Sequence, residues 1–299
     1  ERPNWFAPIG VKQIDHWSFR RSKWFKHVGN ECKNVTKNVG ILDMTPFAKC
    51  YITGPNSEAW LSNLLANQLP SVGGKIKLCH ALNQNGGVRS EFTVLRNSDK
   101  SFYLVSAGAL ERFDHDYIRK NLPKDGSVRY ENVTNRIGVL VIAGPKSRTL
   151  MSRLTDLDFS NKSFPWLSAK IGDIGFSECS IIRVNFVGEL GWEIHHPIEQ
   201  QNNIFDHIMH AGKDLNLKPF GIRALDSLRL EKSYRLIGTE LSIEYAAFES
   251  GLHSFIDLGK GDFVGRTALL NWQKAGLSYS LATLEIHKTK YADAIGSNP

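Results

Sequence analysis

The first half of the chain predicts short strands and helices in alternation. Residues 47–53 alternate apolar and polar side chains and run into Gly54-Pro55, a pattern typical of a strand closed by a turn. The elements expected after it are a helix capped by Ser57, a hairpin of residues 75–82 and 88–96, a strand at 101–106 and a helix at 110–120.

The second half repeats this order. Residues 137–143 form an apolar run that suits a buried strand, and residues 143–147 resemble residues 53–57 closely enough to indicate an internal duplication. Each half reads as strand, helix, hairpin, strand, helix. We therefore expect an α+β fold of two related units with mixed or antiparallel sheets, and a doubly wound nucleotide-binding fold is disfavoured.

Four regions follow from these patterns. They are an N-terminal extension (1–35), a first α+β unit (36–135), a second α+β unit (136–275) and a truncated C-terminal segment (276–299). Within the extension, residues 1–30 are expected to be irregular and laid over the surface. The second unit includes a densely charged helix over 220–234 and a shorter helix around 268–272. The C-terminal segment includes one strand-like piece at 281–286.

Composition excludes several classes of protein. With 299 residues, of which 41% are hydrophobic and 22% charged, the chain can bury a large core without disulfides or a metal. No apolar run approaches the roughly 18 to 20 residues of a membrane span, so we expect no membrane partner. Cysteines at 32, 50, 79 and 179 form no C-x-x-C pair, which favours a reducing compartment and no metal site.

The net charge of +7 raises the question of nucleic acid. The densest basic stretch interleaves cations with aromatic rings and comprises Trp17, Phe19, Arg20, Arg21, Lys23, Trp24, Phe25 and Lys26. Such a segment can stack on bases, or its aromatics can pack on the protein body while the cations stay hydrated. We favour packing and expect no nucleic-acid partner, since no nucleic-acid-binding motif accompanies the stretch. An anionic small molecule suits the charge equally well.

The chain lacks the phosphate-binding, dinucleotide-binding, zinc-protease and serine-hydrolase motifs. His195 and His196 are adjacent on an expected strand and would point to opposite faces, so a shared metal is not expected. Glu91 lies inside a hairpin strand, two residues from Arg89 and on the same face. It could act as a proton acceptor in a cavity, or it could be an exposed glutamate paired with Arg89.

A second candidate is Glu189, between Gly188 and Gly191. Such a turn can present one carboxylate at a fixed angle, and a carboxylate can accept two hydrogen bonds from an amino-pyrimidine edge. Trp192 would supply a flat surface beside it, although a solvated turn glutamate is the alternative. Arg223, Asp226 and the pair Ser227 and Glu231 lie on the charged helix at spacings that favour salt bridges within the helix.

Taken together, segments 137–145, 187–194, 224–232 and 260–266 resemble the aminomethyltransferase family, which includes the T-protein of the glycine cleavage system. The resemblance covers about residues 36–275 and is strongest to the C-terminal half of dimethylglycine and sarcosine dehydrogenases. The chain departs from the glycine-cleavage branch at Ser90-Glu91, where that branch has an Asp pair. Phe186 and Val187 also replace hydroxyl-bearing residues.

The resemblance implies a tetrahydrofolate-dependent transferase region that passes a one-carbon unit from a small amine-derived donor to folate. It implies a catalytic role for Glu91, folate contacts for Glu189, Trp192, Arg223 and Arg229, and no metal. It implies FAD only in an upstream or covalently linked flavin domain, a C-terminal β-barrel that is missing or truncated here, and a bacterial cytoplasmic or mitochondrial matrix location. The alternative is a non-catalytic module of the same fold that regulates or scaffolds a protein complex.

Overall fold

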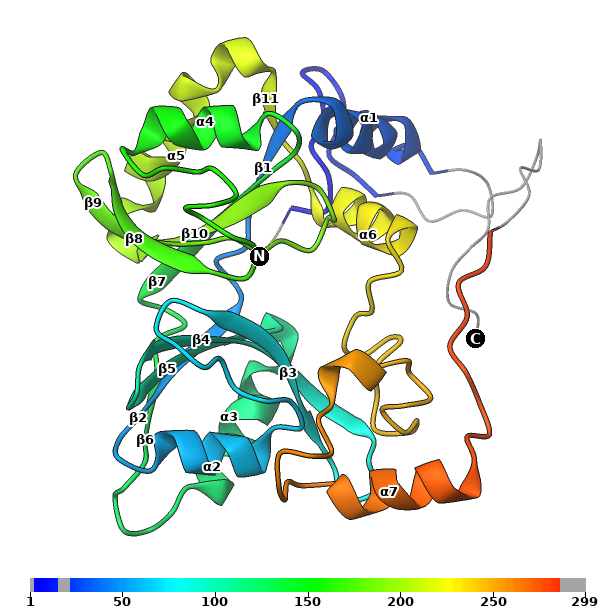
Figure 1. The fold of residues 1–299 in the computed structure, drawn as a ribbon. Helices are drawn as coiled ribbons and strands as arrows, with labels where there is room; N and C mark the ends of the chain where they lie inside the picture. Colours follow the sequence, from blue (N-terminus) through cyan, green and yellow to red (C-terminus); the bar gives the residue numbers. More distant parts are fainter. Residues whose placement is uncertain (1–2, 16–21, 286–299) are drawn as a thin grey trace.

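The computed structural model describes residues 3–15 and 22–285 and contains two β-sheets (Figure 1). The first sheet has the order β3 (Ile76–Leu82), β4 (Val88–Ser98), β5 (Ser101–Ser106), β2 (Ala48–Thr53), β6 (Arg129–Asn132). The second has the order β8 (Ala169–Ile174), β9 (Ser177–Ile182), β10 (Gly191–Pro197), β7 (Ile137–Ala143), β1 (Val39–Asp43), β11 (Leu217–Pro219). Neighbouring strands are antiparallel except β1 and β11, which are parallel.

The expected duplication is confirmed in both sheets. Strands β3-β4-β5-β2 and β8-β9-β10-β7 have the same order, and each set is accompanied by two helices. These helices are α2 (Ser57–Leu64) and α3 (Glu111–Asn121) in one unit, and α4 (Ser147–Leu154) and α5 (Gln201–Ala211) in the other. In each unit the helices cover one face of the sheet and bury an apolar cluster against it.

The turn that starts α2 and α4 is the same in both units. Gly54 and Gly144 have φ of 123° and 131°, and their carbonyls accept hydrogen bonds from the backbone N–H of Ser57 and Ser147. A Cβ at either glycine would meet a backbone oxygen at 2.3 or 2.5 Å. Both serines are first helical residues rather than caps, because Asn56 and Lys146 occupy the cap position.

One strand of the first unit belongs to the sheet of the second unit. β1 directly precedes β2 in sequence but pairs with β7, whereas β6 directly precedes β7 but pairs with β2. The expected boundary at residue 135 therefore does not separate the sheets, because residues 39–43 belong to the second sheet. The other faces of the two sheets meet at an apolar cluster that includes Tyr103, Val105 and Ile182.

The N-terminal region is more ordered than expected. α1 (Phe25–Lys37) packs on β1 and on α6 (Ile222–Glu231), so the interpretation of residues 1–30 as irregular is wrong from residue 25 onward. Only Val28, Glu31 and Val35 of α1 are buried. Because lysines and asparagines separate these three positions, the sequence shows no clear helical pattern of apolar residues. Trp17, Phe19, Arg20 and Arg21 of the basic aromatic stretch lie outside the described residues.

Residues 3–6 secure the start of α6. The carbonyls of Pro3 and Asn4 accept hydrogen bonds from the backbone N–H groups of Ile222 and Arg223. The buried Glu31 carboxylate accepts from the N–H groups of Phe6 and Gly221. Burial raises the pKa of Glu31, opposed by these two hydrogen bonds. The extension thus satisfies N–H groups that a helix leaves free at its N-terminus.

A third apolar cluster joins the β3–β4 hairpin to the residues after α6. Leu82 and Val88 pack there with Leu241, Phe248 and Leu269, the last from α7 (Arg266–Ala275). Lys260 Nζ donates to the carbonyls of Ser62, Leu65 and Asn67 and so closes the C-terminal end of α2. Residues 281–285 form no strand: of their backbone groups only the N–H of Leu281 is seen to bond to a neighbouring segment within the described residues, at the Glu249 carbonyl, and the Thr283 hydroxyl donates to that of Ser233.

The remaining fold expectations concern the barrel and the membrane. No closed barrel is present in residues 3–15 and 22–285, in agreement with the expected absence or truncation of the C-terminal barrel. In the same residues, no helix has both the length and the apolar character that crossing a bilayer requires.

Candidate functional site

Glu91 lies on β4, directly opposite His80 of β3. Its Oε2 is 2.9 Å from His80 Nε2, and the Glu91 side chain is 20% exposed whereas that of His80 is fully buried. Neighbouring Phe92 points the other way, into the cluster under α2 and α3. Glu91 therefore lies on the face of the sheet away from these helices, held on one side and open to solvent on the other.

Arg89 does not pair with Glu91, which corrects one of the two sequence interpretations. The register shifts between Ala81 and Leu82, so Arg89 has no residue opposite it on β3. Its guanidinium instead lies 3.9 Å from the ring centre of Phe113 and 4.3 Å from that of Tyr117, both on α3. Such a bulge re-aims one side chain, so the alternation from Arg89 to Glu91 is broken.

The turn that carries Glu189 is built by Asn185. The Asn185 Oδ1 accepts from the backbone N–H of Val187 and Gly188, while its Nδ2 donates to the Glu189 carbonyl at 2.7 Å. Gly188 has φ of 74°, and a Cβ at Gly191 would lie 2.4 Å from the Ile142 carbonyl oxygen. The two glycines are thus required by backbone conformation and by close packing, respectively.

The Glu189 turn rests on the end of α6. The Glu189 carboxylate, 24% exposed, lies 3.9 Å from Lys232 Nζ, and the Lys232 stem fills the space beside Gly188. Phe186 stacks on Tyr234 with ring centres 6.0 Å apart. Like Glu91, Glu189 is half-buried, has a basic neighbour on one side and remains accessible to a ligand.

Trp192 is placed differently from the expectation. Its side chain is fully buried on the face of β10 covered by α4 and α5, with its ring edge-on to Phe159 and Phe164. In this position it offers no surface to a ligand, because its side chain is fully buried in the apolar cluster under α4 and α5. The expected stacking surface is therefore not available at Trp192.

Arg223 also has a different setting. It donates to Asp15 Oδ2 at 2.6 Å and lies 4.3 Å from the ring centre of Trp24. Both partners belong to the N-terminal region, so the contacts of Arg223 secure that region to α6 rather than forming part of the surroundings of Glu189. The expected bridging within the helix does not occur at this residue.

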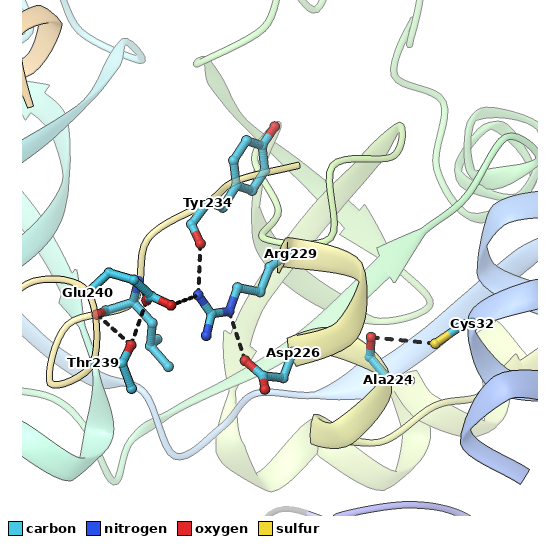
Figure 2. A network of polar contacts seen from close by, with 8 residues as sticks. Cys32, Ala224, Asp226, Arg229, Tyr234, Thr239 and Glu240 are labelled. Carbon is cyan, nitrogen blue, oxygen red and sulfur yellow. Dashed lines mark hydrogen bonds and ion pairs between the residues drawn. The ribbon is translucent and has the colours of Figure 1, made fainter. Parts of the chain in front are cut away.

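Arg229 is 3% exposed and joins three segments (Figure 2). It donates from Nε to Asp226 and from Nη1 to the Tyr234 carbonyl and Glu240, all at 2.8 to 2.9 Å. Burial lowers the pKa of its guanidinium, but the bonds to Glu240 and Asp226 outweigh burial and raise it. These contacts argue against a folate contact and for a role in holding residues 232–241.

The segment after α6 connects the surroundings of both glutamates. It begins with Lys232 and Tyr234 beside the Glu189 turn, and Figure 1 shows it running from α6 toward the part of the chain beside β3. There the Ser242 carbonyl accepts from Val88 N–H, and Ala247 N–H donates to the Gly86 carbonyl. One segment therefore packs against both the Glu189 turn and the Glu91 hairpin, although the described residues show no direct contact between the glutamates.

Other candidate features of the structure lie elsewhere. A surface pocket of about 510 Å³ lies between the β1–β2 connection and the start of α3, and none of the expected site residues lines it. No cluster of three or more potential metal ligands occurs among the described residues, and Cys32, Cys50, Cys79 and Cys179 are free thiols. His80, Lys232 and Asn185 were missed from the sequence; only the glycines around Asn185 marked that position.

Comparison with known proteins decides the family. Residues 1–260 match the profile of the GCVT N-terminal domain. The chain belongs to this family. It is 32% identical to an aminomethyltransferase from Caldanaerobacter subterraneus subsp. tengcongensis, over 94% of this chain and 75% of that protein. It superposes on glycine cleavage system aminomethyltransferase T from Bartonella henselae with a TM-score of 0.75 at 20% identity, covering 92% of this chain and 72% of the other.

A second group of relatives is longer than this chain. The mitochondrial dimethylglycine dehydrogenase of Mus musculus is 36% identical over 96% of this chain but only 33% of that protein. The human protein is also 36% identical, over the same fractions of this chain and of the longer protein. The chain thus spans about a third of the length of these relatives. Both resemblances expected from the sequence, to aminomethyltransferases and to dimethylglycine dehydrogenases, are confirmed.

Proposed function

We propose that this chain is the folate-binding region of a tetrahydrofolate-dependent one-carbon transferase, which passes a methylene or methyl unit from an amine-derived donor to folate. The observation that carries the proposal is the setting of Glu91 and Glu189. The resemblance to the family assigns both a role, both are half-buried, and each has one basic neighbour and an accessible side.

In this proposal Glu189 binds the amino-pyrimidine edge of the pterin, because a carboxylate can accept two parallel N–H donors. Asn185 and the two glycines fix the direction of that carboxylate. Bound tetrahydrofolate supplies the nucleophilic nitrogen that accepts the one-carbon unit. The positive charge of Lys232 partly balances the negative charge of Glu189. The distance from Lys232 Nζ to Glu189 Oε1 is 3.9 Å, which leaves the carboxylate oxygens available to accept hydrogen bonds from the pterin.

Glu91 is the proposed catalytic residue. Its carboxylate would stabilise positive charge that develops at the reacting nitrogen or accept the proton released there. Most of the rate would come from holding folate nitrogen and electrophilic carbon together in a fixed geometry. Trp192, Arg223 and Arg229 take no ligand contact in this proposal, because their side chains are buried or committed to other parts of the protein.

A further part of the proposal concerns the full-length protein to which this chain would belong. We propose a protein of the dimethylglycine or sarcosine dehydrogenase type, in which a linked flavin domain or a protein partner generates the donor and holds FAD. A mitochondrial matrix or bacterial cytoplasmic location accords with such relatives. The alternative of a non-catalytic scaffold gains no support, since the relatives are named as enzymes.

The test compares two glutamate variants of the second unit. Glu189→Ala should weaken tetrahydrofolate binding by about 1–3 kcal/mol, or roughly 5- to 150-fold in Kd, because it removes one partner of a buried bond. The control is Glu178→Ala, an exposed residue of β9 whose loss should leave affinity unchanged. Undiminished affinity in Glu189→Ala, measured by anaerobic calorimetry, would sink the assignment of the pterin site.

A further inference from the structure

The partner of Glu91 is a buried histidine that has a hydrogen-bond partner at only one ring nitrogen within the described residues. His80 is fully buried, and its Nε2 lies 2.9 Å from Glu91 Oε2. Because an ionised carboxylate only accepts hydrogen bonds, the Nε2–H of His80 must be the donor. In the neutral ring, Nδ1 is then an acceptor, yet it is buried and has no hydrogen-bond partner in the described residues.

A second buried histidine in the same fold shows the contrast. His195, on β10, also contacts a glutamate, Glu193, at 3.1 Å through Nε2. Its Nδ1 is paired with the Tyr103 hydroxyl at 3.0 Å, so both ring nitrogens are satisfied at the junction between the sheets. A buried polar atom without a hydrogen-bond partner is costly, and His80 Nδ1 is one of several such side-chain atoms in the described residues.

The C-terminal part of the chain holds the His80 ring in place. Phe255 lies edge-on to it with ring centres 5.7 Å apart and an interplanar angle of 73°. Cys79 and Ala81, on either side of His80 along β3, point into the cluster under α2 and α3. The imidazole is therefore fixed by the strand below it and by Phe255 above it, and its one hydrogen bond goes to Glu91.

We propose that His80 is the positioning residue of Glu91. Glutamate has one more rotatable bond than aspartate, and an unrestrained carboxylate would sample several directions. The His80 bond fixes Oε2 and leaves the rest of the carboxylate for the reacting folate nitrogen. This inference rests on the proposed function, because it assigns His80 a part in the chemistry of Glu91, and a misplacement of about 1 Å can cost about 100-fold in rate.

The first kinetic test uses three variants and one probe reaction. It measures formation of 5,10-methylenetetrahydrofolate from formaldehyde and tetrahydrofolate, less the uncatalysed rate. We expect His80→Leu to lower kcat by about 10- to 100-fold with less than about a twofold change in the KM for tetrahydrofolate. His80→Gln, which keeps an N–H donor, should restore part of the rate. His195→Gln is the matched control and should leave kcat unchanged.

A double variant separates positioning from general damage. If His80 acts only through Glu91, Glu91→Gln and His80→Leu/Glu91→Gln should have the same kcat, because the second change removes nothing further. Additive losses of kcat in the double variant, or an unchanged kcat in His80→Leu, would overturn the inference. The proposed function would still stand if the wild type binds tetrahydrofolate. Phe255→Ala, which retains both partners, should give a smaller loss than His80→Leu.

A measurement on the free protein does not depend on folate. In ¹⁵N NMR of the histidine rings, we expect His80 Nε2 to carry the proton and its resonance to shift on Glu91→Gln, with His195 unaffected. The inference would be overturned if the His80 proton is on Nδ1, or if the His80 ¹⁵N resonances do not shift in Glu91→Gln. Either result counts even if the chain neither binds folate nor turns over the probe. Absence of folate binding alone would count against the proposed function instead.

Discussion

At the residue scale, the hairpin strand that carries Glu91 is anchored by the residue before it. Ser90 donates to Asp114 Oδ1 of α3, and Ser106 of β5 donates to Asp114 Oδ2 at 2.7 Å. Burial raises the pKa of the Asp114 carboxyl, and the two serine hydrogen bonds oppose this effect. Asp114 thus fixes β4 from one face of the sheet while Glu91 remains free to act on the other.

The raised pKa predicts a specific pH dependence of stability. Between the ordinary Asp value of about 4 and the raised folded value, the folded protein binds the Asp114 proton more tightly than the unfolded chain. The contribution of Asp114 to the free energy of unfolding therefore falls as pH rises through this window. Asp114→Asn should gain stability relative to wild type from pH 4 to pH 7, measured by urea unfolding.

The control for this prediction is Asp116→Asn, an exposed residue on the same helix. Its stability should stay parallel to that of the wild type across the same pH range. A constant difference between Asp114→Asn and wild type at all these pH values would contradict a raised pKa.

Single residues of the site were predictable where a local pattern determines them. The glycines around Glu189 indicated a fixed turn, and the turn is present. His80 was not predictable, because its partner depends on the register between β3 and β4 and on a bulge at Arg89. Trp192 was misinterpreted because nothing local reveals which face of β10 the helices α4 and α5 cover.

At the element scale, the segment after α6 depends on Arg229. Its guanidinium holds the Tyr234 carbonyl and Glu240, and Glu240 in turn accepts from the Leu236 N–H and the Thr239 hydroxyl (Figure 2). Because the same segment touches the Glu189 turn and the Glu91 hairpin, its order should matter to both. The spacing of charged residues indicated salt bridges within this helix, but that Arg229 bonds to Asp226 and to Glu240 required the fold.

Arg229→Met should therefore destabilise the protein by about 1–3 kcal/mol, since the bonds from the buried guanidinium to Asp226, Tyr234 and Glu240 are lost. It should also speed hydrogen exchange of the amides in residues 234–241 and weaken tetrahydrofolate binding. The control is Arg153→Met, which removes an exposed pair with Asp214 and should change stability little. Unchanged exchange in residues 234–241 would show that Arg229 does not order this segment.

The helices and strands themselves were predicted best where a strong pattern coincides with turn residues. Both copies of strand, helix, hairpin, strand, helix carry Gly-Pro turns and apolar strands, and both formed as expected. α1 was missed because only three of its residues are buried. The strand expected at 281–286 did not form in its described part, since no neighbouring strand pairs with it.

At the scale of the whole molecule, β1 ties the two units together. The first unit contributes this strand to the sheet of the second, and the sheets also share an apolar cluster and the Tyr103–His195 hydrogen bond. The second sheet is therefore not complete without residues 39–43 of the first unit. No sequence pattern could reveal this pairing, because strand pairing is decided by tertiary contacts rather than by local periodicity.

This arrangement predicts that both units unfold in one transition. Trp192 in the core of one unit and Trp60 on α2 of the other are suitable probes, each observed in a variant in which the other tryptophans are replaced by phenylalanine. We expect the same urea midpoint from both probes. Urea midpoints that differ by more than the experimental error would mean that the units are independent domains, although β1 of the first unit belongs to the sheet of the second.

The central claim is that the Glu189 turn and the Glu91 hairpin form a working tetrahydrofolate site in this chain. Its most direct test is calorimetric titration of the purified protein with tetrahydrofolate under anaerobic conditions. The account predicts micromolar binding at about one site per chain, with a matching rise in thermal stability. Absence of both heat and thermal shift would contradict it, because the chain would then lack the folate site that the two carboxylates are proposed to build.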